Sequence, residues 1–437
     1  MSSLRRKTLL TYVIPATLTS ACLFLFTVVD GIFVGQGVGT AALGAVNMAA
    51  PFTLICAAAF MLSSIGGVTI TAIRLGRGDQ QGANQAFMHS FSATVVLAVI
   101  LSAAGVFFTT PLARLLGANE DYLPMVKDYL FWYSLFVIPN GLSVNLQSFC
   151  RNDGSPSLVA AATVAGTAFN IFADWLFVFP MKMGLMGAAL ATGLSQFITL
   201  VIVLTHFIRK KGVLRFGGCQ ASKALYGKLV FRGLPEMIAQ LATPVTTIFM
   251  NRVLLEQIGD IGVNAYAVIN YVASFTLSIL LGCSEGLQPL FGQSYGAKNE
   301  KDLKYYFRAG AVINLAGSVV IIALILLFDR GICALFNADA QTTTFAVQSM
   351  PQYVWGFVVA GMSILISAYL YSTKRSKQAI ILNVMRSLVV NTVVIQGLPL
   401  LMGKGIVWYT FGIYESIVLV LAVVLLKYSE RNGIEYK

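Results

Sequence analysis

Two acidic residues lie in apolar stretches of the sequence, where a carboxylate could bind a cation or a proton. Asp30 lies in FTVVDGIFVG (26–35) and Asp174 lies in FNIFADWLF (169–177). A charged side chain at the centre of a bilayer costs about 2.5 to 3.5 kcal/mol on insertion scales, so it usually marks a functional site or is strongly paired. The alternative is that both acids lie near the outer ends of their helices and are hydrated.

Uncharged polar residues accompany these acids at helical spacing. Asn170 and Asp174 are four residues apart and therefore face the same side of one helix. Thr192 and Gln196 repeat this spacing in the next apolar stretch. Taken singly, such residues are more often interhelical hydrogen-bond partners than ligands. Together with the acids they form a set of expected buried polar groups.

Four more charged residues lie in or beside apolar sequence. Gln196, Glu285, Glu415 and Arg386 are candidates for a substrate cavity. Alternatively, Glu285 and Glu415 pair with Arg386 or another cation. Both alternatives remain open at this stage. Glu236 directly follows Pro235 and is expected to be a first-turn acid near the cytoplasmic interface, stabilised by the helix dipole.

The motif search favours a transporter over an enzyme. Gly282–Gly286 fits GxSxG, but a nucleophile elbow requires a sharp strand-to-helix turn and a nearby histidine base, and this segment is predicted to lie inside a helix. The sequence contains no GxxxxGK[ST] loop and no GxGxxG, so neither ATP nor a dinucleotide cofactor is expected. Active transport by this chain would draw on an ion gradient.

The elements that carry these residues are predicted to be membrane-spanning helices. The chain has 437 residues, 57% hydrophobic and 11% charged, whereas soluble domains carry roughly 25% charged residues. Runs such as 31–73 and 340–373 hold no charged residue at all and do not alternate as barrel strands would. Twelve spans are expected at 8–34, 41–73, 85–110, 125–150, 157–180, 184–208, 233–255, 261–292, 305–328, 344–371, 378–401 and 406–427.

The basic residues are distributed unevenly between the expected loops. With both termini on one side, 23 Lys and Arg residues fall on that side and 6 on the other. This asymmetry predicts cytoplasmic termini in a multi-pass plasma-membrane protein with lipid as its surroundings. It also explains the net charge of +12 without nucleic acid as a partner.

The sequence repeats itself with a shift of about 220 residues. Pro15 corresponds to Pro235, and Asn170 corresponds to Asn391 within one residue of drift. Six helices in each half predict a parallel repeat, related by a two-fold axis along the membrane normal. The expected organisation is an N-terminal lobe (1–208), a cytoplasmic linker (209–232) and a C-terminal lobe (233–437), with Pro15 and Pro235 as hinges.

Five segments in order resemble the multidrug and toxic compound extrusion (MATE) family, and in particular its bacterial DinF-like branch. They are TVVDGIFVG (27–35), RNDGSP (151–156), NIFAD (170–174), GLMGAALATGLSQ (184–196) and GLQPLFGQSYGAKN (286–299). The likeness covers nearly the whole chain. It implies two six-helix lobes that alternate access by rocking, and export of cationic or amphipathic drugs in exchange for Na⁺ or H⁺.

The resemblance also implies a site for the coupling ion, formed by Asp30, Asn170, Asp174 and Thr192, with Na⁺ as a candidate metal and no other cofactor. These are the positions that the residue pattern selects independently. The rival hypothesis is a flippase or exporter of lipid-linked oligosaccharides or other metabolites from the same superfamily. Such a protein is expected to line its cavity with several arginines, whereas the predicted spans hold only Arg386, Arg252 and Arg308, the last at the start of its span.

Overall fold

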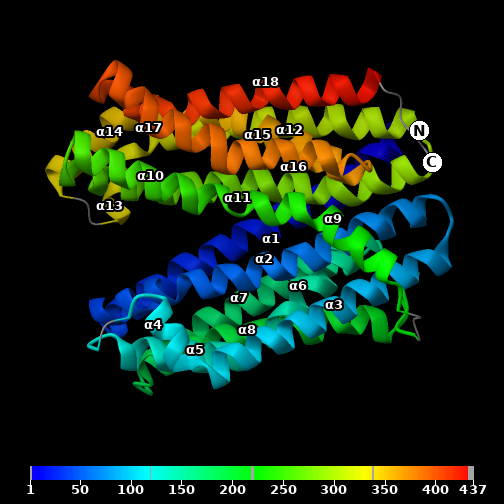
Figure 1. Ribbon diagram of the computed structural model, residues 1–437, viewed down its shortest axis with the longest axis horizontal. Helices are drawn as coiled ribbons and strands as arrows, with labels where there is room; N and C mark the ends of the chain where they lie inside the picture. Colours follow the sequence, from blue (N-terminus) through cyan, green and yellow to red (C-terminus); the bar gives the residue numbers. More distant parts are fainter. Residues whose placement is uncertain (1, 119, 218–220, 337–338, 432–437) are drawn as a thin grey trace. The chain divides into compact units, whose positions relative to one another are not determined.

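The protein is built from α-helices, as its composition predicts. The computed structural model describes residues 2–118, 120–217, 221–336 and 339–431 (Figure 1). No β-strand occurs within these ranges, and short turns join most of the helices. The prediction of an all-α polytopic membrane protein is therefore confirmed.

Ten helical segments of the described chain are long and apolar enough to cross a bilayer, and a pair bent by 42° (α14 and α15) makes an eleventh. The remaining predicted span, 125–150, corresponds to α5 and α6. These helices have 13 and 16 residues, and Phe136 separates them. Neither alone reaches the roughly 20 residues that a spanning helix needs, so the predicted twelfth span is a broken one.

The chain forms two compact units. The N-terminal unit comprises Leu18–Gly233, and the C-terminal unit comprises Leu234–Lys437 together with Met1–Thr17. The first residues of the chain thus pack with the C-terminal unit. The predicted lobes (1–208 and 233–437) instead assign these residues to the N-terminal lobe.

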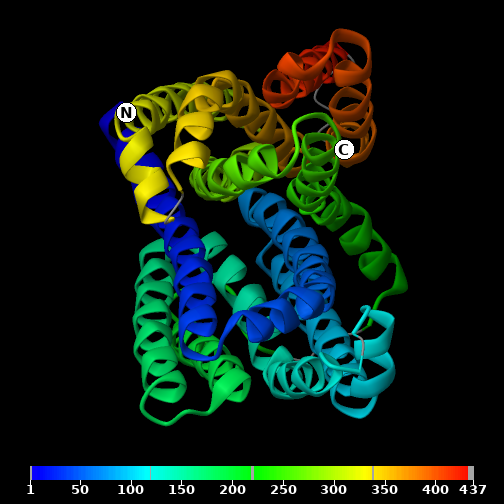
Figure 2. The same cartoon turned by 90° about the vertical axis from the view of Figure 1, so that its left-hand side faces the viewer.

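In the N-terminal unit, α2, α3, α6, α7 and α8 pack against one another, and Figure 2 shows α7 and α8 next to each other. Buried Phe60, Phe87 and Phe149 contribute to its apolar cores. The helices that begin in or enter this unit are α1 (Ser2–Gly37), α2 (Thr40–Gly76), α3 (Gln80–Phe107), α4 (Thr109–Leu115), α5 (Leu123–Leu135), α6 (Val137–Asn152), α7 (Pro156–Val178), α8 (Gly184–Ile208) and α9 (Lys223–Ala239).

In the C-terminal unit, α11, α12, α15 and α18 pack together, and α10 packs on α17. The elements of this unit are α10 (Ala242–Gln257), α11 (Asp260–Gly296), α12 (Glu300–Leu327), α13 (Asp329–Leu335), α14 (Ala340–Val354), α15 (Gly356–Ser372), α16 (Ser376–Val384), a π-helical segment η1 (Met385–Val390), α17 (Asn391–Met402), a 3-10 segment η2 (Lys404–Tyr409) and α18 (Thr410–Arg431).

The internal repeat extends to the lengths and turns of the elements. Helices α2 and α11 both have 37 residues, α3 and α12 both have 28, and α4 and α13 both have 7. Asp79 and Asn299 cap α3 and α12 with side chains that accept from the backbone N–H three residues later. Each follows a residue with positive φ, Gly78 or Lys298. The repeated sequence therefore gives a repeated order of helices.

The chain passes between the units at two points, and a proline lies beside each. Pro15 lies inside α1, two residues before the boundary at Thr17, and Pro235 lies inside α9, one residue after Leu234. A proline inside a helix removes one backbone hydrogen bond and favours bending. The predicted hinge residues thus lie where a bend would change the path of the chain between units.

The first part of the predicted linker is bound to the N-terminal unit. Asp153, in the turn after α6, accepts hydrogen bonds from the backbone N–H groups of Val213 (2.8 Å) and Leu214 (3.2 Å). Its carboxylate also lies 3.0 Å from Nε2 of His206, and both side chains are buried. Asp153 is therefore more than the turn residue that its RNDGSP motif suggests.

The end of the linker is held by the other histidine. Nε2 of His89 accepts from the backbone N–H of Ser222 (2.9 Å), and the imidazole ring packs on Tyr226 with centroids 4.7 Å apart. The Tyr226 hydroxyl lies 2.8 Å from Oγ of Ser92. Residues 218–220 lie outside the described residues, and from Lys223 onward the predicted linker is the beginning of α9.

We expect Asp153→Ala to destabilise the N-terminal unit by about 3 kcal/mol, because the substitution leaves a buried histidine without its carboxylate partner. It also removes the bonds that hold the linker, so trypsin should cleave more rapidly at Arg209, Lys210 and Lys211. Thermal unfolding and limited proteolysis of the purified protein would measure both effects.

The matched control is Asp121→Ala, which removes an exposed acid from another turn of the same unit. Cleavage of Asp153→Ala at the control rate would show that other contacts suffice to hold the linker.

Candidate functional site

The predicted acids meet in the N-terminal unit. Asp30 on α1 and Asp174 on α7 lie within electrostatic range of each other, and Asn170 lies beside Asp174. Asn170 and Asp174 are completely buried. The structure therefore brings together three of the four residues predicted for the ion site, and hydration at a helix end does not describe Asp174.

Several polar atoms of this cluster are buried without a geometric hydrogen-bond partner in the described chain. They include Oδ1 of Asp30, both carboxylate oxygens of Asp174, and both amide atoms of Asn170. Buried polar groups are normally paired, because each unpaired group costs its desolvation free energy. This concentration of oxygen atoms suits a proton or a hard cation such as Na⁺, whose ligands would be carboxylate and amide oxygens.

Helix α1 approaches α7 at Gly37. A Cβ on Gly37 would overlap Val178, whereas Gly31 and Gly39 have no neighbouring atom within 4 Å of a Cβ position. Gly37 allows the end of α1 to pack on the end of α7, four residues beyond Asp174.

A tyrosine on α5 completes the surroundings of the acids and was missed by the sequence reasoning. The buried Tyr129 side chain lies within electrostatic range of both Asp30 and Asp174. Its ring stacks on Tyr133, one helical turn later, with centroids 6.0 Å apart and an interplanar angle of 15°. The signal available in the sequence is a pair of tyrosines at helical spacing in an apolar segment.

Thr192 and Gln196 both lie on α8, which packs on α7, and both are half-buried. The backbone carbonyl of Thr192 accepts from the hydroxyl of Ser195 (2.7 Å). The role of Thr192 as an ion ligand remains a prediction, as does that of Gln196 in a substrate cavity.

In the C-terminal unit, Glu415 pairs with Arg386. Nε of Arg386 donates to Oε1 of Glu415 (2.9 Å), and the Ser363 hydroxyl donates to Oε2 (2.9 Å). Glu415 is 1% exposed and Arg386 is 8% exposed. The alternatives for Glu415 were a place in a substrate cavity or pairing with a cation, and in the structure Glu415 forms an ion pair with Arg386.

Glu236 corrects an expectation. It lies near the end of α9, only three residues before Ala239, and it is buried rather than hydrated at an interface. The helix begins at Lys223, well before Pro235, so proline did not mark its first turn. The amide of Gln240 donates to Glu236 (3.4 Å), and Glu285 and Arg386 lie within electrostatic range. Glu236 and Glu285 thus belong to one charged network with the ion pair.

Arg386 lies where the helix changes locally from α-helical to π-helical hydrogen bonding. The residue lies in η1, where the π-helical ladder accommodates one extra residue between α16 and α17. When the two halves are aligned, Gly154 corresponds to Lys374 with an offset of 220 residues, and Asn170 corresponds to Asn391 with an offset of 221. The second half therefore contains one extra residue between these two pairs, where η1 lies. Single π-helical turns of this kind occur frequently at functional sites. The sequence reasoning recorded the drift but assigned it no meaning.

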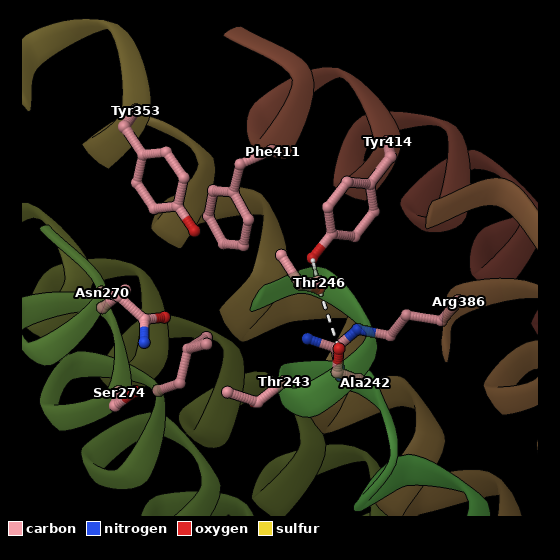
Figure 3. Close-up of a pocket in the computed structure, with 11 residues that line it drawn as sticks. Ala242, Thr243, Thr246, Asn270, Ser274, Tyr353, Arg386, Phe411 and Tyr414 are labelled. Carbon is pink, nitrogen blue, oxygen red and sulfur yellow. Dashed lines mark hydrogen bonds between the residues drawn. The ribbon is translucent and has the colours of Figure 1, made fainter. Parts of the chain in front are cut away.

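Arg386 borders a pocket within the C-terminal unit, shown in Figure 3. Gln196, Glu285 and Glu415, the other residues predicted for a substrate cavity, are not among its lining residues. These are Ala242, Thr243, Thr246, Asn270, Ala273, Ser274, Leu277, Tyr353, Arg386, Phe411 and Tyr414.

The GxSxG match is part of continuous helix. Ser284 is buried in the middle of α11 and donates to the carbonyl of Leu280, one turn earlier (3.1 Å). Asn314 donates to the same hydroxyl (3.4 Å). The two histidines of the sequence belong to the other unit. This geometry is that of a helix-packing serine and not of a nucleophile elbow.

Comparison with known proteins gives one consistent family. The MatE family model matches residues 15–176 and again residues 235–395, so each half of the internal repeat matches it once. The multidrug export protein MepA of Staphylococcus haemolyticus (strain JCSC1435) is 24% identical over 431 residues, covering 98% of this chain and 94% of that protein. MepA of Staphylococcus saprophyticus is 23% identical over 435 residues, with the same coverage.

Solved structures of transporters have the same fold. A crystal structure of MATE in complex with MaL6 matches with a TM-score of 0.91 and 21% identity, covering 98% of this chain and 96% of that one. A mutant of the Vibrio cholerae MATE transporter VcmN matches with a TM-score of 0.92 and 18% identity, covering 100% and 99%. The sequence resemblance to this family is therefore confirmed.

The buried ion pair makes a prediction about stability. Glu415→Gln removes the charge that balances Arg386, so we expect a loss of about 3 to 5 kcal/mol. The double variant Arg386→Gln/Glu415→Gln leaves no unbalanced charge and should recover most of that loss. Unfolding in detergent micelles would measure each variant.

The control pair is Arg252 and Glu256, whose side chains are 67% and 57% exposed on α10. Glu256→Gln should change stability by less than about 1 kcal/mol, as is typical of exposed pairs. A double variant as unstable as Glu415→Gln would contradict the pairing argument.

Proposed function

The chain belongs to the MatE family, and from this premise we propose that it is a secondary transporter that exports cationic and amphipathic small molecules in exchange for Na⁺ or H⁺. Two of its relatives are named multidrug export proteins, which supports drugs as the class of substrate. The proposed location is the plasma membrane, with lipid around the helices and no cofactor besides the coupling ion.

The observation that carries the proposal is the meeting of Asp30 and Asp174 inside the N-terminal unit. Two neighbouring carboxylates repel each other and disfavour double ionisation, so they favour the uptake of a proton or a cation between them. Asn170 and Thr192 are the further oxygen donors proposed for Na⁺. With either ion, the site would alternate between a neutralised and a negatively charged state.

Exchange follows from competition for that negative charge. A cationic drug is attracted by the ionised pair, and a bound proton or Na⁺ removes the attraction. The coupling ion would therefore release the drug from the protein, and loss of the ion would restore binding. We propose that the two units rock between inward-open and outward-open states, as in other secondary transporters built from repeats.

Helix α1 is the element best suited to link ion binding to this motion. It carries Asp30 in the N-terminal unit and begins in the C-terminal unit, with Pro15 between the two parts. A change in charge at Asp30 would alter its contact with Asp174, and hence the position of the helix. The bend at Pro15 would then carry this change to the first turns of α1.

The rival proposal of a flippase for lipid-linked oligosaccharides is less well supported. Such a substrate carries a pyrophosphate, which calls for several unpaired arginines. Arg252 is exposed and pairs with Glu256 on its own helix (3.0 Å). Among the arginines of the predicted spans, only Arg386 borders the pocket, and its Nε already donates to Glu415.

The imbalance of basic residues predicts that both termini and the linker face the cytoplasm. In a variant without native cysteines, Lys223→Cys should react with an impermeant maleimide only after the cells are opened. Glu120→Cys, in a loop predicted to face outward, should react in intact cells. Reaction of Lys223→Cys in intact cells would refute the orientation.

Asp174→Asn keeps the shape of the side chain and removes its charge. We expect it to abolish gradient-driven transport of a cationic dye into inside-out vesicles, tested with Na⁺ and H⁺ gradients imposed separately. Asp30→Asn should do the same, and the double variant should be no worse than either single one, because the two acids act as one unit.

The matched control is Asp128→Asn, an exposed acid on α5 that accepts from Trp132 (3.0 Å). It should leave transport unchanged. Full transport by Asp174→Asn, in a protein that is expressed and folded like the parent, would be incompatible with the proposed coupling site.

A further inference from the structure

The turn between α15 and α16 in the C-terminal unit holds a buried arginine whose outer N–H groups are unpaired. Arg375 is 8% exposed, and both of its Nη groups are buried without a hydrogen-bond partner among the described residues. Removing a guanidinium from water costs free energy, which an acid partner normally offsets. A buried polar group in this condition calls for a partner such as an ion.

Two serine hydroxyls of the same turn are in the same condition. Ser372 is the last residue of α15 and Ser376 is the first residue of α16. Both are buried, and neither Oγ has a hydrogen-bond partner in the part of the chain that the structure describes. No described side chain caps the first turn of α16. The turn therefore combines four unpaired side-chain atoms that can donate with an uncapped helix start.

An aromatic ring fixes the position of the guanidinium. Cζ of Arg375 lies 5.9 Å from the centroid of the Tyr369 ring. That ring packs against Phe291 and Phe307, with centroids 5.4 and 4.9 Å away. A cation–π contact attracts the charge to the ring, but the N–H groups at the edge of the guanidinium can still donate. Apolar contacts thus hold the arginine in place.

The equivalent turn in the N-terminal unit shows how a charge at this place is balanced. Gly154 corresponds to Lys374 in the repeat and both have positive φ, so Asp153 corresponds to Thr373. The Asp153 carboxylate accepts from two linker N–H groups and lies beside His206, and all of these partners come from outside its turn. The turn in the C-terminal unit carries donors in place of the acid, so the corresponding partner from outside would be an anion.

The surroundings of the turn favour a phosphate group. A guanidinium fork binds two oxygens of an anion in parallel, and a phosphate has further oxygens for hydroxyl groups and for the N–H groups of a helix start. Lys374 is half-buried and Lys377 is exposed, so more positive charge lies at the surface beside the buried donors. The distribution of basic residues predicts that this turn faces the cytoplasm, at the level of the lipid headgroups.

From these observations we propose that the turn at residues 372–377 binds a phosphate group, either of an anionic phospholipid in the cytoplasmic leaflet or of a soluble phosphate. The Nη groups of Arg375 donate to two of its oxygens, and the hydroxyl groups of Ser372 and Ser376 donate to the others. The bound phosphate bridges the end of α15 and the start of α16 and stabilises the C-terminal unit. This binding is independent of the acid pair and of ion-coupled transport.

Thermal unfolding of the purified full-length protein in phosphate-free detergent solution tests the site with three probes. They are dioctanoyl phosphatidylglycerol, the zwitterionic dioctanoyl phosphatidylcholine, and inorganic phosphate. A ligand that binds only the folded state raises the melting temperature, and the dependence on its concentration gives an apparent Kd. Tighter binding of phosphatidylglycerol than of phosphatidylcholine would identify the lipid headgroup as the source, and stabilisation by inorganic phosphate would identify a soluble one. Neither result would overturn the proposal only if one of them were observed; the absence of both overturns it.

Substitutions in the turn distinguish a built site from general attraction to a basic loop. Arg375→Gln should raise the apparent Kd of the effective probe about tenfold, which corresponds to about 1.4 kcal/mol. Arg375→Lys keeps the charge without the planar fork and should also weaken binding. The matched control is Lys377→Gln, which removes an exposed charge from the same turn and should change the Kd less than about twofold. An equal loss in Arg375→Gln and Lys377→Gln would contradict the proposed site.

Stability without any probe separates a binding role of Arg375 from a structural one. Since the guanidinium has no acid partner to lose among the described residues, Arg375→Gln should then unfold at the temperature of the parent protein or higher. Earlier unfolding would indicate a structural role and contradict the proposal. Ser372→Ala/Ser376→Ala keeps the arginine and should also weaken binding of the effective probe. Unchanged binding by this double variant would overturn the site even if Arg375→Gln failed to fold.

Discussion

The placement of two neighbouring carboxylic acids in apolar helices of a membrane protein is the constraint around which the N-terminal unit is arranged. Asp30 and Asp174 together would cost on the order of 5 to 7 kcal/mol on insertion scales if each were isolated. Their proximity allows a single proton or cation to offset much of this cost. That proximity requires α1 to approach α7, which the absence of a side chain on Gly37 permits beside Val178. The proximity of the two acids and the packing of α1 on α7 therefore depend on the same contact.

The repeat shows how one scaffold can hold opposite charges. Both units have the same order of helices, the same capped turns and a buried asparagine at equivalent positions, Asn170 and Asn391. The two units differ in their charged residues. Apolar residues in the C-terminal unit replace the acids Asp30 and Asp174 of the N-terminal unit. The extra residue of the π-helical segment presents Arg386 there. Glu415 balances the arginine, so the charge of Arg386 is present together with its partner.

The sequence was sufficient for the fold class, the repeat and the central acids, because these features leave periodic or costly signals. The composition shows that the helices are too apolar for a soluble protein. A carboxylate in such a helix stands out because inserting it into a bilayer costs free energy. Asn170 shares a helix face with Asp174, so its position followed from spacing alone. The prediction of cytoplasmic termini has a comparable basis, the uneven distribution of lysine and arginine, and it awaits labelling.

The remaining features depend on contacts between residues far apart in the chain. Tyr129 joins the acids only because α5 packs near them, and no spacing in the sequence shows it. Glu236 was expected at a helix start because a proline precedes it, but α9 begins at Lys223, several turns before that proline. The linker looked like a plain basic connection, yet Asp153 and His89 bind its two ends. Local patterns carry little information about such partners.

The two places where the chain passes between units are each held from both sides. Helix α1 is tied to the C-terminal unit by the ion pair of Arg5 and Asp302 (2.6 Å) and reaches the N-terminal unit at Asp30. Helix α9 is tied to the N-terminal unit through Ser222 and His89, and to the C-terminal unit where Asn383 donates to the carbonyl of Pro235 (2.6 Å).

Any movement of one unit relative to the other must be absorbed by the two segments between these anchors. One segment runs from Arg5 to Asp30 and the other from Ser222 to Pro235. Each contains or ends at a proline, where the helix has lost a backbone hydrogen bond and bends at lower cost. Only the first segment ends at one of the two neighbouring acids. A change of charge at Asp30 would therefore act on one of the two connections between the units, whereas α9 carries no such acid at the end of its segment.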